Sequence, residues 1–187
     1  MHQHAPGSDD EPTKVGEELG FLNVVDFAVE MIARRKPHAS PLASRLIVDL
    51  TRVADVVVYD IESTVHRPQG WSWSAFRVLF TLWLTGPLES RRITTMTGMS
   101  RAAVSALIGT LERDGLVTRR PAPSDHRTRE VALTDTGLDT VDRVFDEHNE
   151  REQLWASTLS VDEQKELARL LEKLSHAVDE RGIKTRM

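Results

Sequence analysis

The 187-residue chain contains no cysteine. This absence excludes disulfide bonds, thiolate metal sites and redox sensing by a thiol. Long apolar runs are also missing: the longest, 78–84, is interrupted by Thr81 and falls far short of the roughly 18 to 20 residues that a membrane helix needs. The N-terminal segment is polar and acidic, without the basic and apolar regions of a secretory signal. We therefore expect a cytoplasmic protein with no membrane partner.

Signatures of catalysis are lacking as well. The sequence has no P-loop, no glycine fingerprint for a dinucleotide, no HExxH or GxSxG motif, and no plausible nucleophile constellation. We predict that the protein is not an enzyme and has neither catalytic residues nor a cofactor. His148 and Glu152 stand four residues apart and could suggest a metal pair, but no third ligand is nearby. The favoured interpretation is a charged helix face, so no metal site is predicted.

Two helices separated by a glycine turn are predicted between Arg91 and Gly115. The first, RRITTMTG, is closed by Gly98, and Ser100 is a good N-cap for the second. In the second helix, apolar residues recur at steps of three and four and predict one buried stripe: Val104, Leu107, Ile108 and Leu111. Most side chains on its opposite face are short enough for a major groove about 12 Å wide. That face carries Arg101, Ala102, Ser105, Ala106 and Gly109.

A basic hairpin is predicted directly after this helix. Two strand-like runs, LVTRRPA and TREVALT, flank Pro123, Ser124 and Asp125, with His126 and Arg127 at the tip. The stretch 91–129 holds eight arginines against three acidic residues, a net charge of +5, so the rest of a chain whose total is −5 carries −10. An acidic protein with its positive charge concentrated in this way has the electrostatic pattern of local nucleic-acid contact.

The segments MSRAAVSALIGTLERDGLVTRR and SDHRTREVALTDTG resemble the MarR family of bacterial transcription regulators. The match includes Asp125 and Arg127 with one residue between them, followed by Leu133, Thr134 and Gly137, and the resemblance spans roughly 41–181. It implies a mainly α fold, in which a winged helix-turn-helix lobe with a small antiparallel β-wing is joined to a helical dimerisation region from both ends of the chain. It also implies a homodimeric, sequence-specific DNA-binding transcription regulator, usually a repressor.

Helical periodicity and turn residues suggest the domain organisation. A long helix, about 41–65, has two adjoining apolar stripes, so we expect it to be buried on two sides, one of them against a partner subunit. Further helices are predicted at 72–85, from 135 to about 157, and at 161–180. The last of them has a leucine stripe that a small lobe cannot cover, so we expect a partner subunit to cover it. The predicted parts are a flexible tail 1–14, an extra N-terminal helix 15–36, a dimerisation region 37–70 with 135–187, and a DNA-binding lobe 71–134.

Minimal MarR-like proteins lack the extra helix, whereas some extended ones, including the urate-responsive branch, possess it. In that branch the added helix carries a tryptophan and an aspartate lies early in the helix before the DNA-contacting helix. Here the first helix has no tryptophan and the corresponding region contains Ala75, Phe76 and Arg77, so urate is not implied.

The resemblance and the charge pattern assign DNA contacts to particular residues. Arg127 is expected to enter the minor groove, where a guanidinium suits a narrow A·T-rich shape, with Asp125 orienting it and His126 beside it. Phosphate contacts, which position a protein without determining sequence preference, are expected from Arg91, Arg92, Arg119, Arg120 and Arg129. The major groove is expected to receive Ser100, Arg101, Ala102, Ser105 and Ala106. An alternative is a winged-helix protein-interaction module without DNA binding, which the retained basic face disfavours.

A ligand pocket is predicted around the 72–85 helix, because in MarR-like folds this junction lies near a cleft that binds small aromatic ligands. The residues that would line it are His66, Trp71, Trp73, Phe76, Arg77, Phe80 and Trp83. The rings offer apolar stacking surface, while Arg77 and His66 could hold a carboxylate, so the predicted effector is a small aromatic anion. The alternative for the rings is a filled aromatic core, and Arg77 either pairs with an acid or faces the cleft.

Overall fold

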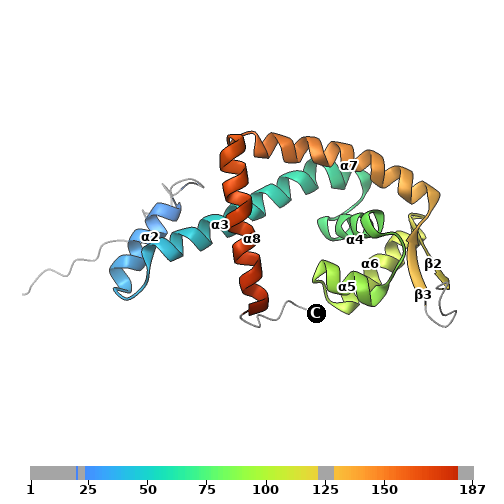
Figure 1. Cartoon of the computed structure of the whole chain (residues 1–187), viewed down its shortest axis with the longest axis horizontal. Coiled ribbons are helices and arrows are strands. Elements are labelled where there is room, and N and C mark those ends of the chain that lie inside the picture. Colours follow the sequence, from blue (N-terminus) through green and yellow to red (C-terminus); the bar gives the residue numbers. More distant parts are fainter. Residues whose placement is uncertain (1–19, 21–23, 122–128, 181–187) are drawn as a thin grey trace, which may run out of the picture. The chain divides into compact units, whose positions relative to one another are not determined.

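The computed structural model describes residues 20, 24–121 and 129–180 (Figure 1). The chain forms two compact units, 1–56 and 57–187. The predicted fold class is confirmed, since the described elements are mostly helices accompanied by a small antiparallel sheet. The predictions for the tail 1–14 and for Asp125, His126 and Arg127 fall outside the described residues. Within the described residues, none of the helices has the length and apolar character needed to cross a membrane.

The first unit contains helix α2 (Val24–Arg35) and most of α3 (Pro41–Ile61). The helix predicted over 15–36 is corrected at its start, because Gly20 is not helical and the described helix begins at Val24. Glycine loses more backbone freedom in a helix than any other residue, which disfavours continuation through it. Pro41 occupies the first position of α3, and the Ser40 hydroxyl accepts a hydrogen bond of 3.2 Å from the Ala43 amide.

The α-helix predicted over 41–65 ends at Ile61 and continues in two other helical forms. Glu62–His66 form a π-helical turn, η1, and Arg67–Gln69 a 3-10 turn, η2. The chain then reverses at Gly70, whose φ of 78° lies in the left-handed region that favours glycine. This change of helical form leaves Val65 and His66 buried in the second unit.

Three helices form the centre of the second unit: α4 (Trp73–Thr85), α5 (Ser90–Thr97) and α6 (Arg101–Arg113). Ser72 caps α4, and its hydroxyl accepts from the Ala75 amide at 3.1 Å. The apolar faces of these helices meet in one core with residues from the sheet and from the next helix. Its most buried members include Val78, Leu79, Ile93, Val104, Ile108, Val131 and Val141.

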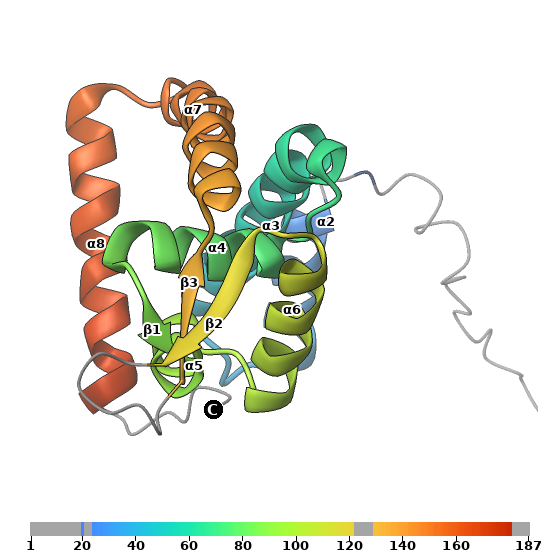
Figure 2. The same ribbon diagram turned by 90° about the vertical axis from the view of Figure 1, so that its right-hand side faces the viewer.

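The sheet consists of β1 (Leu88–Glu89), β2 (Val117–Pro121) and β3 (Arg129–Leu133) in the order β1-β3-β2, all antiparallel (Figure 2). The predicted hairpin strands are confirmed, and their register pairs Val117 with Leu133. The two-residue β1 was not predicted, because so short a strand displays no alternation of apolar and polar residues.

Two long helices complete the second unit: α7 (Asp135–Ala156) and α8 (Val161–Glu180). Thr134 joins the sheet to α7, because its hydroxyl accepts from the Gly137 amide at 2.9 Å and donates to the Gly115 carbonyl at 2.7 Å. A Cβ at Gly137 would lie 2.0 Å from the Leu116 carbonyl oxygen, so glycine is required at this close approach. Ser160 and Glu163 form a capping box at the start of α8, since the Ser160 amide donates to the Glu163 carboxylate at 2.8 Å.

Candidate nucleic-acid interface

Helix α6 presents opposite faces to the core and to solvent. Val104, Ile108 and Leu111 are buried, and Leu107 is partly buried, as the predicted stripe requires. The Ser100 hydroxyl accepts from the Ala103 amide at 3.2 Å and so fixes the start of the helix. The residues assigned to the major groove are all exposed on the other side: Ser100, Arg101, Ala102, Ser105 and Ala106. This side is narrow because, apart from Arg101, it carries only short side chains.

The turn before α6 is held in part by Arg77, a residue that we predicted to line the ligand pocket. Gly98 ends α5 with a φ of 67°, and its amide donates to the Thr94 carbonyl at 3.0 Å. Arg77 of α4 donates to the main-chain carbonyl of Thr97, in the last turn of α5. Both alternatives for Arg77 are therefore corrected, since its described partner is a helix-terminal carbonyl rather than an acid or a ligand cleft. A cation at this end also interacts favourably with the helix dipole.

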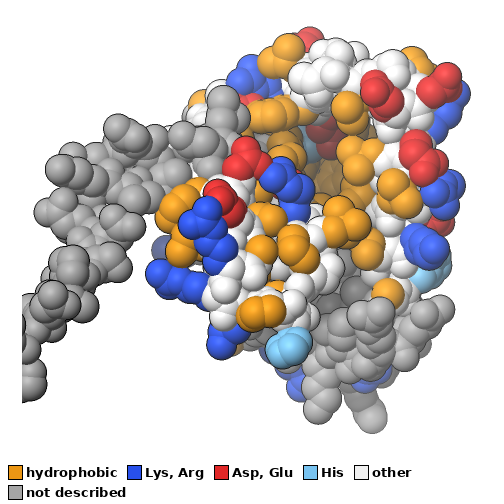
Figure 3. All heavy atoms as spheres, turned by 90° about the vertical axis from the view of Figure 1, so that its left-hand side faces the viewer, with side chains coloured by type: hydrophobic (Ala, Val, Ile, Leu, Met, Phe, Trp, Pro, Cys, Tyr) orange, Lys and Arg blue, Asp and Glu red, His pale blue; other side chains and the backbone are white. Residues whose placement is uncertain are grey.

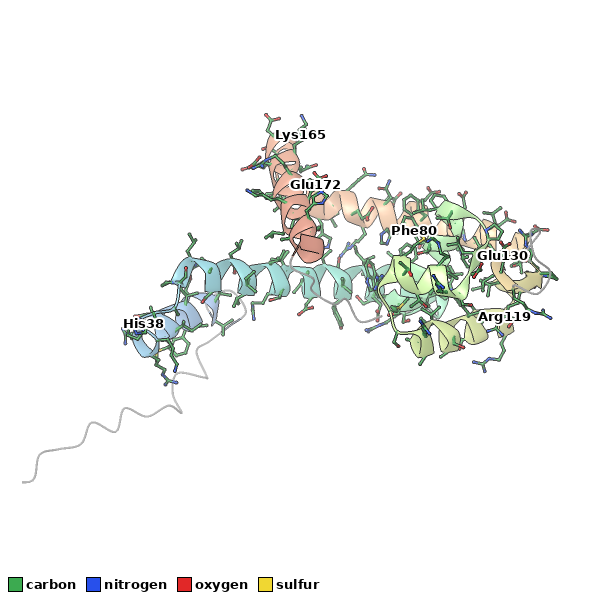
Figure 4. The ribbon with its side chains drawn as sticks, turned by 60° about the horizontal axis from the view of Figure 1, so that its bottom comes forward. His38, Phe80, Arg119, Glu130, Lys165 and Glu172 are labelled. Carbon is green, nitrogen blue, oxygen red and sulfur yellow. The ribbon has the colours of Figure 1, made fainter. Side chains whose placement is uncertain are left out.

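The predicted phosphate-contacting residues all lie at the surface of the same lobe. Arg91 and Arg92 are exposed on α5, Arg119 and Arg120 on β2, and Arg129 at the start of β3. Arg119 forms an ion pair of 3.5 Å with Glu112 of α6. Arg120 is opposite Glu130 in the strand register, and Figure 4 shows Arg119 and Glu130 together on the wing. An exposed ion pair of this kind contributes little to stability, so the arginines remain available to other anions.

Most residues of the predicted ligand pocket form one aromatic cluster between α4 and α7. The rings of His66 and Phe76 stack with centroids 4.1 Å apart, and Trp73 lies 5.5 Å from His66. Phe80 and Trp83 extend the cluster from α4, where Figure 4 labels Phe80. The sequence reasoning missed that Phe145 and His148 of α7 belong to the same cluster. Their three-residue spacing on one helix face was the available signal.

Two other predicted pocket residues lie in different surroundings. Trp71 is buried and lines a cleft of about 450 Å³, together with Gln69, Gly70, Asp114, Leu116 and Thr140. Arg77 is directed to α5, as described above, whereas His66 is directed to α7. The two residues expected to hold a carboxylate are therefore directed to different elements, and they do not form the predicted anchor for an anion.

His148 is buried, so its interpretation as part of a charged helix face is wrong. Its Nδ1 lies 3.2 Å from Nε2 of His66, and its own Nε2 lies 3.1 Å from a carboxylate oxygen of Glu152. Burial and, to a lesser degree, the neighbouring His148 lower the pKa of His66 to about 4, against the opposing charge of Glu62. Among the described residues, no group of three or more His, Asp or Glu side chains could hold a metal ion.

A second polar contact joins the end of α3 to α7. Asp60 accepts two hydrogen bonds of 2.6 Å from Arg151 and one of 2.8 Å from the Trp155 indole. These bonds hold the pKa of the Asp60 carboxyl below its ordinary value. The bidentate geometry links the last turn of α3, which lies in the second unit, to α7.

Comparison with known proteins agrees with this architecture. The model of the MarR family matches residues 71–128. The chain is 32% identical over 133 residues to the HTH-type transcriptional regulator YwaE of Bacillus subtilis, covering 71% of this chain and 78% of that protein. A structure of reduced AbfR bound to DNA is 28% identical, has a TM-score of 0.57, and covers 73% of this chain and 94% of its own. The RdhR-CbdbA1625 regulator in its 2,4-dichlorophenol-bound form has a TM-score of 0.68 at 19% identity, covering 81% and 90% of the two chains.

The fold, the exposed α6 face and the basic wing strands define a winged helix-turn-helix transcription regulator that binds DNA, and these relatives are regulators rather than enzymes. The chain belongs to the MarR family.

Proposed function

We propose that the protein is a homodimeric repressor that binds a pseudo-palindromic operator and releases it when a small aromatic ligand binds. The observation that carries the proposal is the exposed α6 face, flanked by exposed arginines of α5, β2 and β3 on one lobe. Phosphate contacts supply affinity and position, while groups on a helix in the major groove supply specificity. The lobe carries both kinds of group on exposed positions, which supports the proposal.

The proposed DNA contacts fall into three chemical kinds: contacts to base edges, to phosphates and to the minor groove. Ser100, Arg101 and Ser105 provide polar groups for base edges, and Ala102 and Ala106 allow a close approach. Arg91, Arg92, Arg119, Arg120 and Arg129 contact phosphates. At the wing tip, Arg127 enters the minor groove with Asp125 and His126 beside it. The whole set lies within the proposed DNA-binding lobe, 71–134.

Dimerisation is proposed through the helices outside this lobe, in 37–70 and 135–187. Support comes from each unit separately. In the second unit, α8 exposes Leu167, Leu170, Leu171 and Leu174, and Figure 3 shows hydrophobic side chains along one side of the helix with charged ones along the other. In the first unit, α3 exposes Leu42, Leu46, Ile47 and Val53. Contiguous apolar surface on a soluble protein marks an interaction site. Two-fold symmetry then predicts operator half-sites separated by about one helical turn.

Ligand release is proposed to involve the aromatic cluster of α4 and α7. RdhR-CbdbA1625 is described with 2,4-dichlorophenol, a small aromatic compound. In our protein the cluster lies where α7 meets the lobe, so a ligand there could change the spacing of the two α6 helices. It must bind the wrongly spaced dimer more tightly than the DNA-competent one, because equal affinity would shift nothing.

The test is duplex binding over a salt series, using the DNA upstream of the protein's own gene and a scrambled duplex of equal length. Arg120→Ala should weaken both duplexes equally and lower the salt slope by about 1, because one phosphate contact is lost. Arg101→Ala should weaken the operator more than the scrambled duplex, by about 1 to 3 kcal/mol per half-site. Lys165→Ala on α8 is the control and should change neither.

Salt-insensitive or absent binding to both duplexes would contradict DNA recognition by this lobe. Sedimentation tests the dimer separately, and a stable monomer at micromolar concentration would contradict the proposed assembly. A rise in expression of the adjoining gene when the protein is deleted is the expected result for a repressor.

A further inference from the structure

The cleft of about 450 Å³ that Trp71 borders is separate from the aromatic cluster and from the proposed DNA contacts. Three segments that are distant in sequence form its walls: the turn from η2 to α4, the end of α6 and the first turns of α7. Its volume falls within the range of small-molecule sites, about 300 to 1,000 Å³. Its lining residues are Gln69, Gly70, Trp71, Asp114, Leu116 and Thr140.

Hydrogen bonds hold these walls in place. The Trp71 amide donates to the His66 carbonyl at 3.0 Å and so fixes the turn before α4. Arg143 of α7 donates to the side-chain oxygen of Gln69 at 3.0 Å, which ties the second wall to the first. At the end of α6, Gly115 has a φ of 74°, which turns the chain directly into β2. A cleft with fixed walls binds a ligand without first ordering its own residues.

The charge of the cleft is negative. Asp114 is the only ionisable group among its lining residues, and it is exposed at the C-cap of α6, where the helix dipole adds further negative character. Asp139 is exposed beside the lining residue of α7. The arginines near the cleft have other acceptors: Arg113 donates to two groups of its own helix, and Arg143 donates to two side chains. The carboxylate of Asp114 therefore favours a cation.

The polar side chains of the lining add two donors and an acceptor. Within the described residues, His66 Nδ1 is the only buried side-chain polar atom without a hydrogen bond, and the Trp71 indole N–H donates to no described acceptor. The indole nitrogen is therefore accessible, although Trp71 is only 5% exposed. Gln69 accepts through its amide oxygen and keeps its NH2 group as a donor. The Thr140 hydroxyl donates within its own helix at 2.6 Å, so its oxygen can accept from a ligand.

We propose that this cleft is a binding site for a small protonated amine that also carries a hydroxyl or carbonyl oxygen, such as an amino alcohol. The ammonium group donates to Asp114 and Thr140, and the ligand oxygen accepts from Trp71 and Gln69. An anion is disfavoured because the single charged lining group is a carboxylate. The site goes beyond the proposed function, since it uses neither the DNA contacts nor the aromatic cluster.

The test compares three matched probes on the full-length protein at constant ionic strength. The first, trans-2-aminocyclohexanol, carries both groups, whereas cyclohexylamine lacks the hydroxyl and trans-cyclohexane-1,2-diol lacks the charge. Nitrogen-15 NMR of labelled tryptophan follows the four indole N–H signals, and Trp→Phe variants at 73, 83 and 155 identify the Trp71 signal by elimination. We expect the amino alcohol to shift that signal with half-saturation at a concentration about tenfold lower than either other probe, because each lacks one strong hydrogen-bonding group.

Asp114→Asn tests the source of the selectivity, because it keeps the shape of the side chain and removes its charge. In this variant the amino alcohol and the diol should half-saturate within about twofold of each other, since the charge-assisted hydrogen bond is lost. Asp146→Asn is the matched control, because it removes the same charge from an exposed position of α7 outside the cleft. This variant should keep the preference of the parent protein.

Equal half-saturation by the three probes in the parent protein would overturn the inference. So would an unchanged preference in Asp114→Asn, or a response of the Trp155 indole in place of the Trp71 indole. Asp114 and Asp146 are both exposed, so the variants should remain folded, and the unchanged indole signals of the ligand-free samples would verify this.

Discussion

Helices α6 and α8 have similar sequence patterns and opposite surroundings. Both carry apolar residues at steps of three and four, and both begin at a serine cap. In α6, the residues Val104 and Ile108 are 0% exposed, whereas the four leucines of α8 are 37 to 45% exposed. An amphipathic stripe therefore predicts that a helix will be covered, but not which chain covers it.

The polar faces of the two helices explain their different roles. The outer face of α6 carries short side chains and arginine, which suit a negatively charged groove. That of α8 carries intrahelical ion pairs, such as Arg169 with Glu166 at 2.7 Å, which keep it solvated. Under the proposed function, α6 packs its apolar side in its own core and turns its polar face to DNA, whereas α8 keeps its charged face in solvent and turns its leucines to a partner subunit.

The largest expected difference comes from truncating one residue in each stripe. Ile108→Ala should lower the free energy of unfolding by about 2 to 5 kcal/mol, because it leaves a cavity in a filled core. Leu170→Ala should leave the unfolding of the isolated subunit within about 0.5 kcal/mol, because its side chain is already partly in water. Denaturant unfolding at low protein concentration measures both changes.

Sedimentation of the same variants separates stability from assembly. We expect Leu170→Ala to raise the dimer dissociation constant and Ile108→Ala to leave it unchanged under conditions where the protein is folded. Equal destabilisation of the isolated subunit by both variants would show that the leucine stripe of α8 is covered within one chain.

Much of this comparison could be predicted from sequence. The bounds of α6 and α8, the caps Ser100 and Ser160, and the hairpin strands follow from local rules, because caps, periodicity and turns act over a few residues. The exposed α6 face and the exposed arginines also followed, since solvated polar residues need no tertiary partner to be located. The proposed DNA contacts remain predictions at the level of individual residues.

The errors concern contacts between residues distant in sequence. His148 lies 82 positions from His66, and Arg77 lies 20 positions from Thr97, so neither contact leaves a local pattern. A histidine four residues before a glutamate looks like part of a solvated face unless its burial is known. The π turn Glu62–His66 was missed for the same reason, because tertiary packing rather than propensity selects that form.

Gly137 lies in the first turn of α7, where the chain passes from β3 of the DNA-binding lobe into the helices proposed for dimerisation. Gly137→Ala should destabilise the protein by about 3 kcal/mol, because the added methyl meets a main-chain carbonyl that cannot move independently of β2. Gly109→Ala is the matched control, since no described atom beyond its chain neighbours and its own helix backbone lies within 4 Å of its ideal Cβ position and a helix interior favours alanine. Thermal unfolding should therefore separate the two variants, and similar melting temperatures would contradict the close approach.

Acid should lower the free energy of unfolding through His66, which is buried in the second unit. Its pKa is lowered to about 4 in the folded protein, against about 6.5 when unfolded. Above pH 6.5 the His66 imidazole is neutral in both the folded and the unfolded state, so stability does not depend on its titration. Between pH 6.5 and 4 the unfolded chain binds a proton at this residue that the folded chain does not bind. Stability should therefore fall by roughly 2 to 3 kcal/mol over this window. His66→Phe should remove this part of the pH dependence, and exposed His38→Gln should retain it; an unchanged slope in His66→Phe would contradict the assignment.

The smallest expected effect comes from removing the serine cap of each helix. This pair of variants compares α6 and α8 most directly, because the same hydroxyl group is removed from both. Ser100→Ala and Ser160→Ala each delete a hydroxyl that accepts from a main-chain amide, a loss of about 1 kcal/mol. In α6 that loss should appear in global unfolding, because the helix cannot fray without exposing Val104. In α8 it should appear as faster amide exchange in the first turn, with global unfolding of the isolated subunit unchanged, because fraying there exposes little that is buried. Serine-to-aspartate variants at the same positions keep the cap and should restore both values. A loss of global stability in Ser160→Ala equal to that in Ser100→Ala would place α8 in the cooperative core of a single chain.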